Sequence, residues 1–271
     1  MITNESYDSR MKSRDIQYKG NVITFFRVSQ SDKNSYMCLE FPCPIKRMGI
    51  IFDSASRFVS YIDALIIKHI TGVDITSQVM ENERILGAKT HVRNAISGNR
   101  MAESLSCLMN KITLWVVNYI KFGYVKYEGK IVNTGNSFIA YCNPNDKELG
   151  CFENRESVSK RTYCLSIKGK NKLGCAIMQV RDDINMKKSN TWTRVGHEGE
   201  CTIAFSNVIL PELFSLFVEC VMDLYDVEYN MISIPDSTKS CAVSIKMKFN
   251  DDEYMERIKN RISEYPMIIP I

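Results

Sequence analysis

The chain has 271 residues, of which 45% are hydrophobic and 24% are charged. This is the balance of a globular protein, because disordered chains have fewer apolar residues and a larger net charge. Apolar runs such as 115–117 are much shorter than the roughly 20 residues that cross a membrane, and no apolar stretch precedes Val22. We therefore expect a soluble protein of the cytoplasm or of a host-cell nucleus, not a secreted one, whose ten cysteines are reduced.

Charge is distributed unevenly along the sequence. Residues 155–194 contain ten basic and three acidic residues, a net +7, whereas residues 195–271 contain six and thirteen, a net −7. Residues 1–48 contain eight basic and five acidic residues, a net +3. A basic centre beside an acidic end is typical of proteins that bind polyanions. The alternative is that these segments form oppositely charged faces that only solvate the protein.

The N-terminal part predicts a flexible basic arm over residues 1–19, followed by one globular unit over 20–271. Two intertwined halves, 20–120 and 121–271, are an option within that unit. Three strands open it, since β-branched and aromatic residues are dense there. The predicted strands are residues 21–28, 36–41 and 49–52, the second of them stopped by Pro42 and Pro44, which cannot donate to a ladder.

Helical periodicity follows these strands. Apolar residues recur at helical spacing from 56 to 71, with Asp53 or Ser54 as the N-cap and Gly72 at the end. A weaker helix is predicted near 78–86 and a stronger one over 100–120.

The rest of the chain mixes strands with two further helices. Pro211 marks the start of one helix, and Asp251 and Asp252 mark the start of the other, because their negative charge suits a helix N-terminus. The fold class predicted from these elements is α+β, with antiparallel sheets and packed helices. The predicted strands are 124–127, 130–133, 137–142, 162–168, 174–180, 200–205 and 241–249; the helices are 211–225 and 251–263, and 142–159 is a loop.

Two blocks of the chain share an order of predicted elements. Gly20-x-x-Ile23-x-x-Phe26-Arg27 can be overlaid on Gly174-x-x-Ile177-x-x-Val180-Arg181. Each block then predicts further strands and a helix, 56–71 in one and 211–225 in the other. The pattern indicates two related β-β-β-α units whose helices share a core. Chance similarity between two ordinary units is the alternative.

The sequence offers little for catalysis or metal binding. There are only three histidines, and no two cysteines have the Cys-x-x-Cys spacing of a structural zinc site. Residues 169–174 have the outer glycine spacing of a phosphate-binding P-loop, but Cys175 and Ala176 stand where Lys and Ser/Thr are required. We therefore expect a protein that is not an enzyme and that uses no metal or cofactor.

The remaining signal is a basic region interleaved with aromatic residues. Proteins that bind single strands combine cations along the phosphates with aromatic faces on which bases stack. A predicted basic turn, 185–190, leads into Trp192, which is either a stacking residue or a core residue. The candidate nucleic-acid-binding residues are Lys168, Lys170, Lys172, Arg181, Lys187, Lys188, Trp192, Arg194, Lys19 and Arg27.

The order of elements in residues 172–225 resembles the unit shared by Whirly proteins and the transcriptional positive cofactor four family. The resemblance implies antiparallel sheets paired by helices, and binding of single-stranded DNA on a curved β surface. It implies that Lys187, Lys188, Trp192 and Arg194 lie on the basic hairpin and strand of that surface. Richness in Asn, Lys and Ile, with many Met and Cys, also suits a large DNA virus or phage.

The expected partners are therefore single-stranded DNA or RNA, with further copies of the same chain as an open alternative and no membrane. The rival hypothesis is a structural or interaction protein, such as a viral matrix protein, nucleoprotein or host-factor binder, whose basic patch serves docking. Salt dependence distinguishes the two, because phosphate contacts release counterions.

Overall fold

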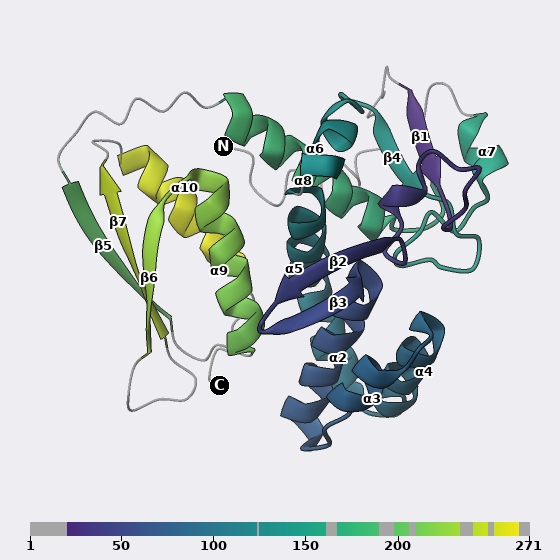
Figure 1. Ribbon diagram of the computed structural model, residues 1–271, viewed down its shortest axis with the longest axis horizontal. Helices are drawn as coiled ribbons and strands as arrows, with labels where there is room; N and C mark the ends of the chain where they lie inside the picture. The colour runs from purple at the N-terminus through teal and green to yellow at the C-terminus, as the bar shows by residue number, and fades with distance from the viewer. Residues whose placement is uncertain are drawn as a thin grey trace. The chain divides into compact units, whose positions relative to one another are not determined.

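A computed structural model of the chain describes residues 21–123, 125–160, 167–189, 198–205, 210–233, 241–248 and 252–265 (Figure 1). The chain divides into two compact units, which are described separately. Unit 1 is formed within residues 1–41 and 124–181, and unit 2 within residues 42–123 and 182–271. The α+β class predicted from the sequence is confirmed, but the units do not coincide with the halves 20–120 and 121–271. The predicted arm, 1–19, lies outside the described residues.

Unit 1 is built around two parallel strands. β1 (Val22–Phe25) pairs with β4 (Phe138–Tyr141), with Val22 opposite Phe138 and Phe25 opposite Tyr141. The short 3-10 helix η1 (Ser35–Met37), α6 (Val125–Val132), α7 (Arg155–Ser159) and the first part of α8 (Lys172–Ser189) complete it. The rings of Phe25 and Tyr141 stack at 5.2 Å between centroids, which joins the strands through side chains as well as through the ladder.

Residues 174–180, predicted as a strand, are helical in α8, as is most of the predicted basic turn 185–190. Leu173, Ile177, Val180 and Ile184 are all buried, and their spacing of four, three and four residues is that of one helix face. The strand prediction was wrong because this helical period of buried residues outweighs the strand propensity of Ile177 and Val180.

Other strand predictions in unit 1 have mixed outcomes. Residues 125–132 form α6 instead of strands, with Tyr127 and Ile131 buried one helical turn apart. Residues 36–41 contain the end of η1 and turns instead of a strand. The ring of Tyr36 stacks on that of Tyr127, with 6.4 Å between the ring centroids. Aromatic residues favour strands only as a tendency, and packing overrides it here. Strands 21–28 and 137–142 are confirmed in shorter form as β1 and β4, and most of the predicted strand 162–168 lies outside the described residues.

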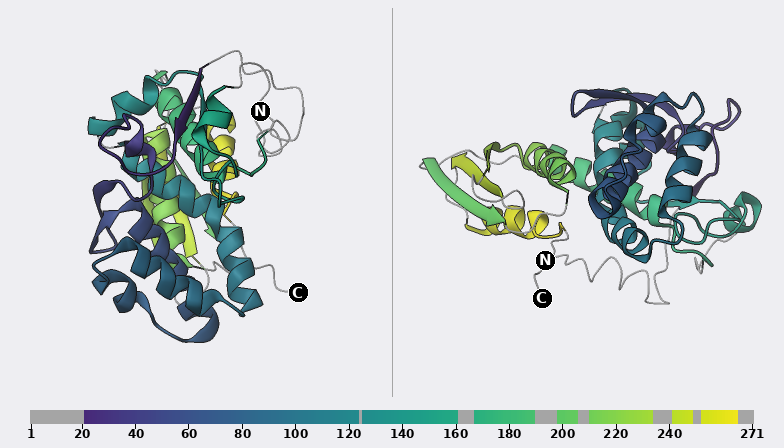
Figure 2. Two further views of the ribbon diagram at one scale, coloured as in Figure 1. Left: turned by 90° about the vertical axis from the view of Figure 1, so that its right-hand side faces the viewer. Right: turned by 90° about the horizontal axis from the view of Figure 1, so that it is seen from below.

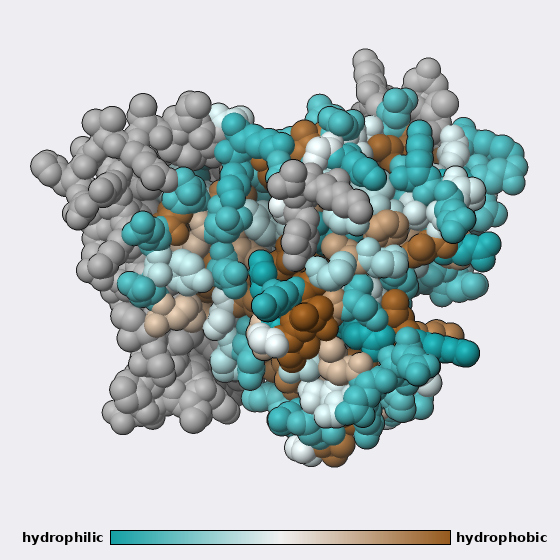
Figure 3. Space-filling view, viewed as in Figure 1, coloured by the Kyte–Doolittle hydropathy of each residue, from teal (hydrophilic) through white to brown (hydrophobic). Residues whose placement is uncertain are grey.

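Unit 2 begins with a hairpin of β2 (Pro42–Arg47) and β3 (Ile50–Ser54). Pro42 and Pro44 lie inside β2 rather than ending a strand, because both are exposed on a two-stranded sheet and the register shifts between Pro42 and Ile45. Most of the coloured surface in Figure 3 is hydrophilic, with a hydrophobic patch over this hairpin, where Ile51 is 65% exposed.

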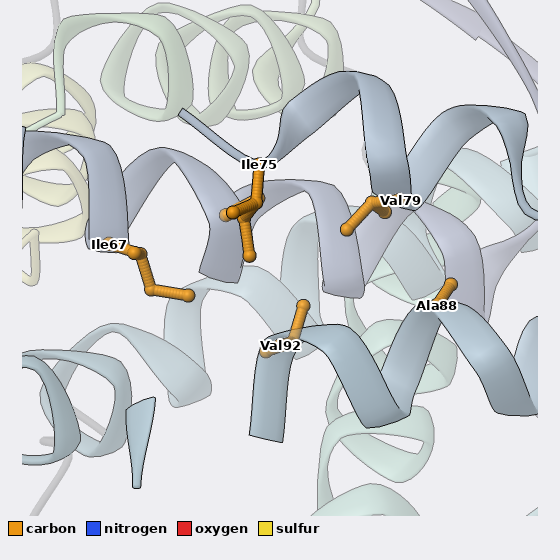
Figure 4. Packing of buried hydrophobic residues seen from close by; sticks show 6 residues of the cluster. Ile67, Ile75, Val79, Ala88 and Val92 are labelled. Atoms are coloured by element: carbon orange, nitrogen blue, oxygen red, sulfur yellow. The ribbon is translucent and has the colours of Figure 1, made fainter. Parts of the chain in front are cut away.

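Helices α2 (Ala55–Thr71), α3 (Thr76–Glu81), α4 (Ile85–Ile96) and α5 (Arg100–Gly123) follow the hairpin. The predicted helix 56–71 is confirmed as α2. Ser54 caps it by accepting a hydrogen bond from Arg57 N, and Gly72 ends it in the left-handed region. Figures 1 and 2 show α3 and α4 beside α2, and Figure 4 shows the apolar core between them. This core contains Ala64, Ile67, Ile75, Val79, Ala88 and Val92.

The last part of unit 2 contains α9 (Pro211–Tyr225), α10 (Asp252–Ile262) and an antiparallel sheet. The sheet has the order β5 (Glu198–Phe205), β7 (Cys241–Lys248), β6 (Glu228–Ser233). Helix α5 packs against both α2 and α9, and α9 packs against α10. The predicted helices 211–225 and 251–263 and strands 200–205 and 241–249 are thus confirmed within a few residues, while β6 was not predicted.

The proposed duplication is not supported by these elements. The block 174–225 begins with helix α8 and continues with β5 and α9, whereas the block 20–71 contains three strands and a helix. The two blocks therefore do not share an element order, and the hairpin required by the resemblance to Whirly proteins is replaced by helix at Lys187 and Lys188. None of the helices within the described ranges has the length and apolar character needed to cross a membrane.

Candidate nucleic-acid interface

None of the predicted binding residues that the structure describes lies on a β-strand. Lys168 and Lys170 lie in the segment of unit 1 that leads into α8, and Lys172 is the first residue of that helix. Lys187 and Lys188 lie in the last turn of α8, in the part assigned to unit 2. Arg27 is exposed after β1, and Arg181 is buried in α8. The remaining candidates lie outside the described residues; they are Lys19, Trp192 and Arg194.

The three clustered lysines are held by pairing between two segments, residues 147–151 and 168–173, which we call the lysine loop pair. Lys170 N donates to Lys147 O at 2.7 Å, Gly169 N to Cys151 O at 2.7 Å, and Asn171 N to Gly150 O at 3.0 Å. Lys172 N and Leu173 N donate to Glu148 O and Leu149 O. These main-chain bonds fix the path of both segments, so the lysine positions do not depend on side-chain contacts alone.

Glycine is required at Gly169 by this pairing. A Cβ atom there would lie 2.2 Å from Gly150 O, which is main chain and cannot move aside. Gly174 has the same constraint against β4, because its Cβ would lie 2.3 Å from Ile139 O. The glycine spacing seen in the sequence therefore reflects close main-chain packing, not a P-loop.

Asn171 joins the loop pair to the sheet. It is fully buried, with φ of +50°, a region that asparagine tolerates better than most residues. Its side-chain nitrogen donates to Ile139 O at 2.9 Å, and its Oδ1 accepts from Tyr141 N at 2.9 Å. The start of α8 is thereby held against β4.

The loop pair has a positive charge. Its residues 147–151 and 168–173 contain four lysines and one glutamate, a net +3. Lys147, Lys168 and Lys170 are exposed. Glu148 accepts from the ammonium groups of Lys170 at 2.8 Å and Lys172 at 2.7 Å, and these two lysines lower the pKa of its carboxyl to about 2. The carboxylate is thus charged at neutral pH and partly neutralises two of the four cations.

Nearby acidic groups of unit 1 have structural partners. Arg155 in α7 donates to Asp32 Oδ2 at 2.9 Å and to Thr24 O at 3.1 Å, which ties α7 to β1. The buried Glu153 accepts from Lys168 N at 3.3 Å.

Within the part of the chain that the structure describes, no three His, Cys, Asp or Glu side chains come together as metal ligands.

Arg181 is a correction to the predicted site. Its side chain is 4% exposed, and its guanidinium donates to Ser137 O at 2.7 Å and lies 3.4 Å from Thr134 Oγ1. It holds α8 against the turn that precedes β4, so it is not a phosphate contact.

Lys187 and Lys188 are exposed but stand on a helix rather than a hairpin turn. Lys187 Nζ lies 2.9 Å from Asp223 Oδ2, and both side chains are substantially exposed. Cations in the last turn of a helix interact favourably with its dipole, which gives these lysines a structural reason to be there.

Sequence reasoning missed two residues of the loop pair region. Lys147 lies in the segment 142–159, which the sequence predicts as a loop, and its acidic neighbours Asp146 and Glu148 do not distinguish it from the rest of that loop. Phe152, which is 44% exposed and has a φ of +58°, is not among the predicted binding residues. Only the pairing of 147–151 with 168–173, which lie about twenty residues apart in sequence, brings them to the predicted lysines.

Comparison with known proteins gives no family. No family model and no curated protein matches the chain. A solved structure, the NMR structure of the E. coli protein YbiA, matches with a TM-score of 0.46 and 17% sequence identity. The match covers 65% of this chain and 92% of YbiA.

Proposed function

We propose that this protein binds single-stranded nucleic acid, without catalysing a reaction, through the lysine loop pair of unit 1. The observation that carries the proposal is the convergence of Lys168, Lys170 and Lys172 with Lys147 on a frame of main-chain hydrogen bonds. Cations with fixed main-chain positions lose less conformational entropy when a phosphate binds. We expect the protein to act inside the cell.

Glu148 does not cancel this positive charge. Its carboxylate is half exposed, as is the Lys170 side chain, and exposed ion pairs stabilise a fold by only about 0–1 kcal/mol. A phosphate can therefore compete with Glu148 for Lys170 at small cost. Lys147 and Lys168 add to the local positive potential.

The test is a fluorescence-anisotropy titration of a labelled single-stranded oligonucleotide at several salt concentrations. Affinity should fall steeply with salt, because each phosphate contact releases counterions, with a slope of about 0.7 per contact for single strands. Lys168→Ala and Lys170→Ala should each weaken binding to all sequences and reduce the slope by about 0.7.

Lys160→Ala is the matched control. Lys160 is an exposed lysine of the same unit that pairs with Glu156 at 2.6 Å, and it is not part of the loop pair. Its loss should leave the slope unchanged. Absence of binding at low salt, or equal effects of all three substitutions, would reject the proposal and favour an interaction protein with a basic docking patch.

A further inference from the structure

Phe152 combines exposure with an unfavourable main-chain conformation. Its side chain is 44% exposed, although Phe25 and Phe138 of the same unit are at most 2% exposed. Its φ is +58°, in the left-handed region that favours glycine and that is an outlier for a bulky residue. An exposed phenylalanine at this position adds little to folding, so another reason for the side chain is required.

The neighbours of Phe152 are fixed to the lysine loop pair. Cys151 is fully buried and Glu153 is 6% exposed, so the chain turns inward on both sides of Phe152 and leaves its ring outside. Cys151 O accepts from Gly169 N at 2.7 Å, and Glu153 Oε2 accepts from Lys168 N at 3.3 Å. The main chain of Phe152 is thus held by the residues on either side of it.

Phe152 also touches the loop pair directly. A Cβ atom on Gly169 would lie 2.8 Å from Phe152 N, so the main chains of the two residues are in close contact. Gly169 stands between Lys168 and Lys170, both of which are exposed. An exposed phenylalanine is therefore in main-chain contact with the glycine that separates two exposed lysines, and the main chain of both segments has a fixed path.

We propose that Phe152 is a stacking surface for an unpaired base of the nucleic acid whose phosphates contact Lys168 and Lys170. This inference rests on the proposed function and specifies its ligand. A π-face stacks on any base, and cations beside it follow the phosphates. Bases inside a duplex are not available to such a ring, so stacking at Phe152 confers preference for single strands over duplexes.

The experiment compares Phe152→Ala with the wild-type protein on a single-stranded oligonucleotide, its duplex, and a strand in which abasic sites replace the bases. Phe152→Ala should weaken single-strand binding about 5- to 150-fold with the salt slope unchanged, because the phosphate contacts remain. Binding of the duplex and of the abasic strand, which offer no free base, should be the same for both proteins. Phe152→Tyr keeps an aromatic ring and should bind as the wild type does.

Phe152→Gly keeps the test valid if the alanine variant folds poorly. Glycine relieves the positive φ, so this variant should melt at or above the wild-type temperature and still lose single-strand binding. Wild-type affinity in Phe152→Gly, or an equal loss on the abasic strand, overturns the role of Phe152 while leaving the lysine site intact. Absence of salt-dependent binding by the wild-type protein itself rejects the proposed function instead.

Discussion

The side chain of Asn171 accepts a hydrogen bond from the main-chain N–H of Tyr141, at 2.9 Å from Oδ1 to nitrogen. Its amide nitrogen simultaneously donates to the carbonyl of Ile139, so one buried residue satisfies two main-chain groups of β4. Because Asn171 directly precedes α8 and pairs through its own N–H with Gly150, it joins the helix, the strand and the lysine loop pair.

Asn171→Ala should therefore destabilise the protein by about 2–5 kcal/mol, since two buried main-chain groups lose their partner and alanine disfavours positive φ. Asn171→Gly removes the same hydrogen bonds but accommodates the φ, so its loss should be smaller. Urea unfolding measures both. The exposed Asn133 supplies a control, and Asn133→Ala should stay within about 0.5 kcal/mol. If all three variants unfold alike, Asn171 does not have this role.

Glu148→Gln should tighten binding of single-stranded nucleic acid. The substitution removes the negative charge that pairs with Lys170 and Lys172, so both cations become available to phosphates. We expect a steeper salt slope, by up to about 0.7, because Lys172 becomes a phosphate contact in addition to Lys170. Glu156→Gln makes the same change in net charge at an exposed glutamate of α7 and should alter neither quantity. Equal tightening by the two variants would mean that only overall charge matters.

Arg181→Ala should affect stability and not the salt slope. Its guanidinium donates to Ser137 O inside the protein, and truncation leaves that carbonyl without this donor. The expected loss is about 2–4 kcal/mol of unfolding free energy. Lys168→Ala should show the reverse, with little loss of stability and a flatter salt slope. A flatter slope for a fully folded Arg181→Ala protein would return Arg181 to the binding site.

The sequence predicted those elements whose local signals agree. Helix α2 has an apolar period, Ser54 as cap and Gly72 as stop, and all three are observed. Helix α8 was mistaken for a strand and a turn because Ile177 and Val180 favour strands individually, whereas burial follows a helical period through Leu173 and Ile184. Propensity and period disagreed there, and the period was correct.

The candidate site could be predicted only in part, for a different reason. Lys168, Lys170 and Lys172 are close in sequence, and their charge is visible in composition. Lys147 joins them only through pairing of segments about twenty residues apart, and the exposure of Phe152 depends on burial of the residues beside it. Such contacts have no periodic or compositional signal.

The cysteines should be reduced, as expected from the sequence. The seven cysteines whose side chains the structure describes form no disulfide. Alkylation of the folded protein, mapped by mass spectrometry, should modify the exposed Cys107 before the buried Cys142, Cys151 and Cys220, which should react only after unfolding. Under denaturing, non-reducing conditions nearly all ten thiols should react, and a count lower by four or more would indicate disulfides.

Asp63 should make stability depend on pH. Burial raises the pKa of its carboxyl to about 6 from an ordinary 3.8, although Ser106 Oγ donates to it at 2.7 Å and opposes the shift. Because the folded-state pKa is the higher one, the stabilising effect is complete below pH 3.8 and is lost as the pH rises through 6. Unfolding free energy should fall by about 3 kcal/mol across this window.

Asp63→Asn tests this, because the amide cannot ionise and its oxygen can still accept from Ser106. Denaturant unfolding at intervals from pH 4 to pH 7 should show no such decline for the variant, which should exceed the wild type in stability at pH 7. Ser106→Ala removes a hydrogen bond that favours the charged carboxylate, so it should move the decline to higher pH. Asp74→Asn is the control of opposite sign. Lys68 lowers the Asp74 pKa below its ordinary 3.8, so Asp74 stays ionised from pH 4 to pH 7 and that substitution should leave the decline in this window unchanged. Parallel profiles for wild type and Asp63→Asn would show that this carboxyl does not govern the pH dependence.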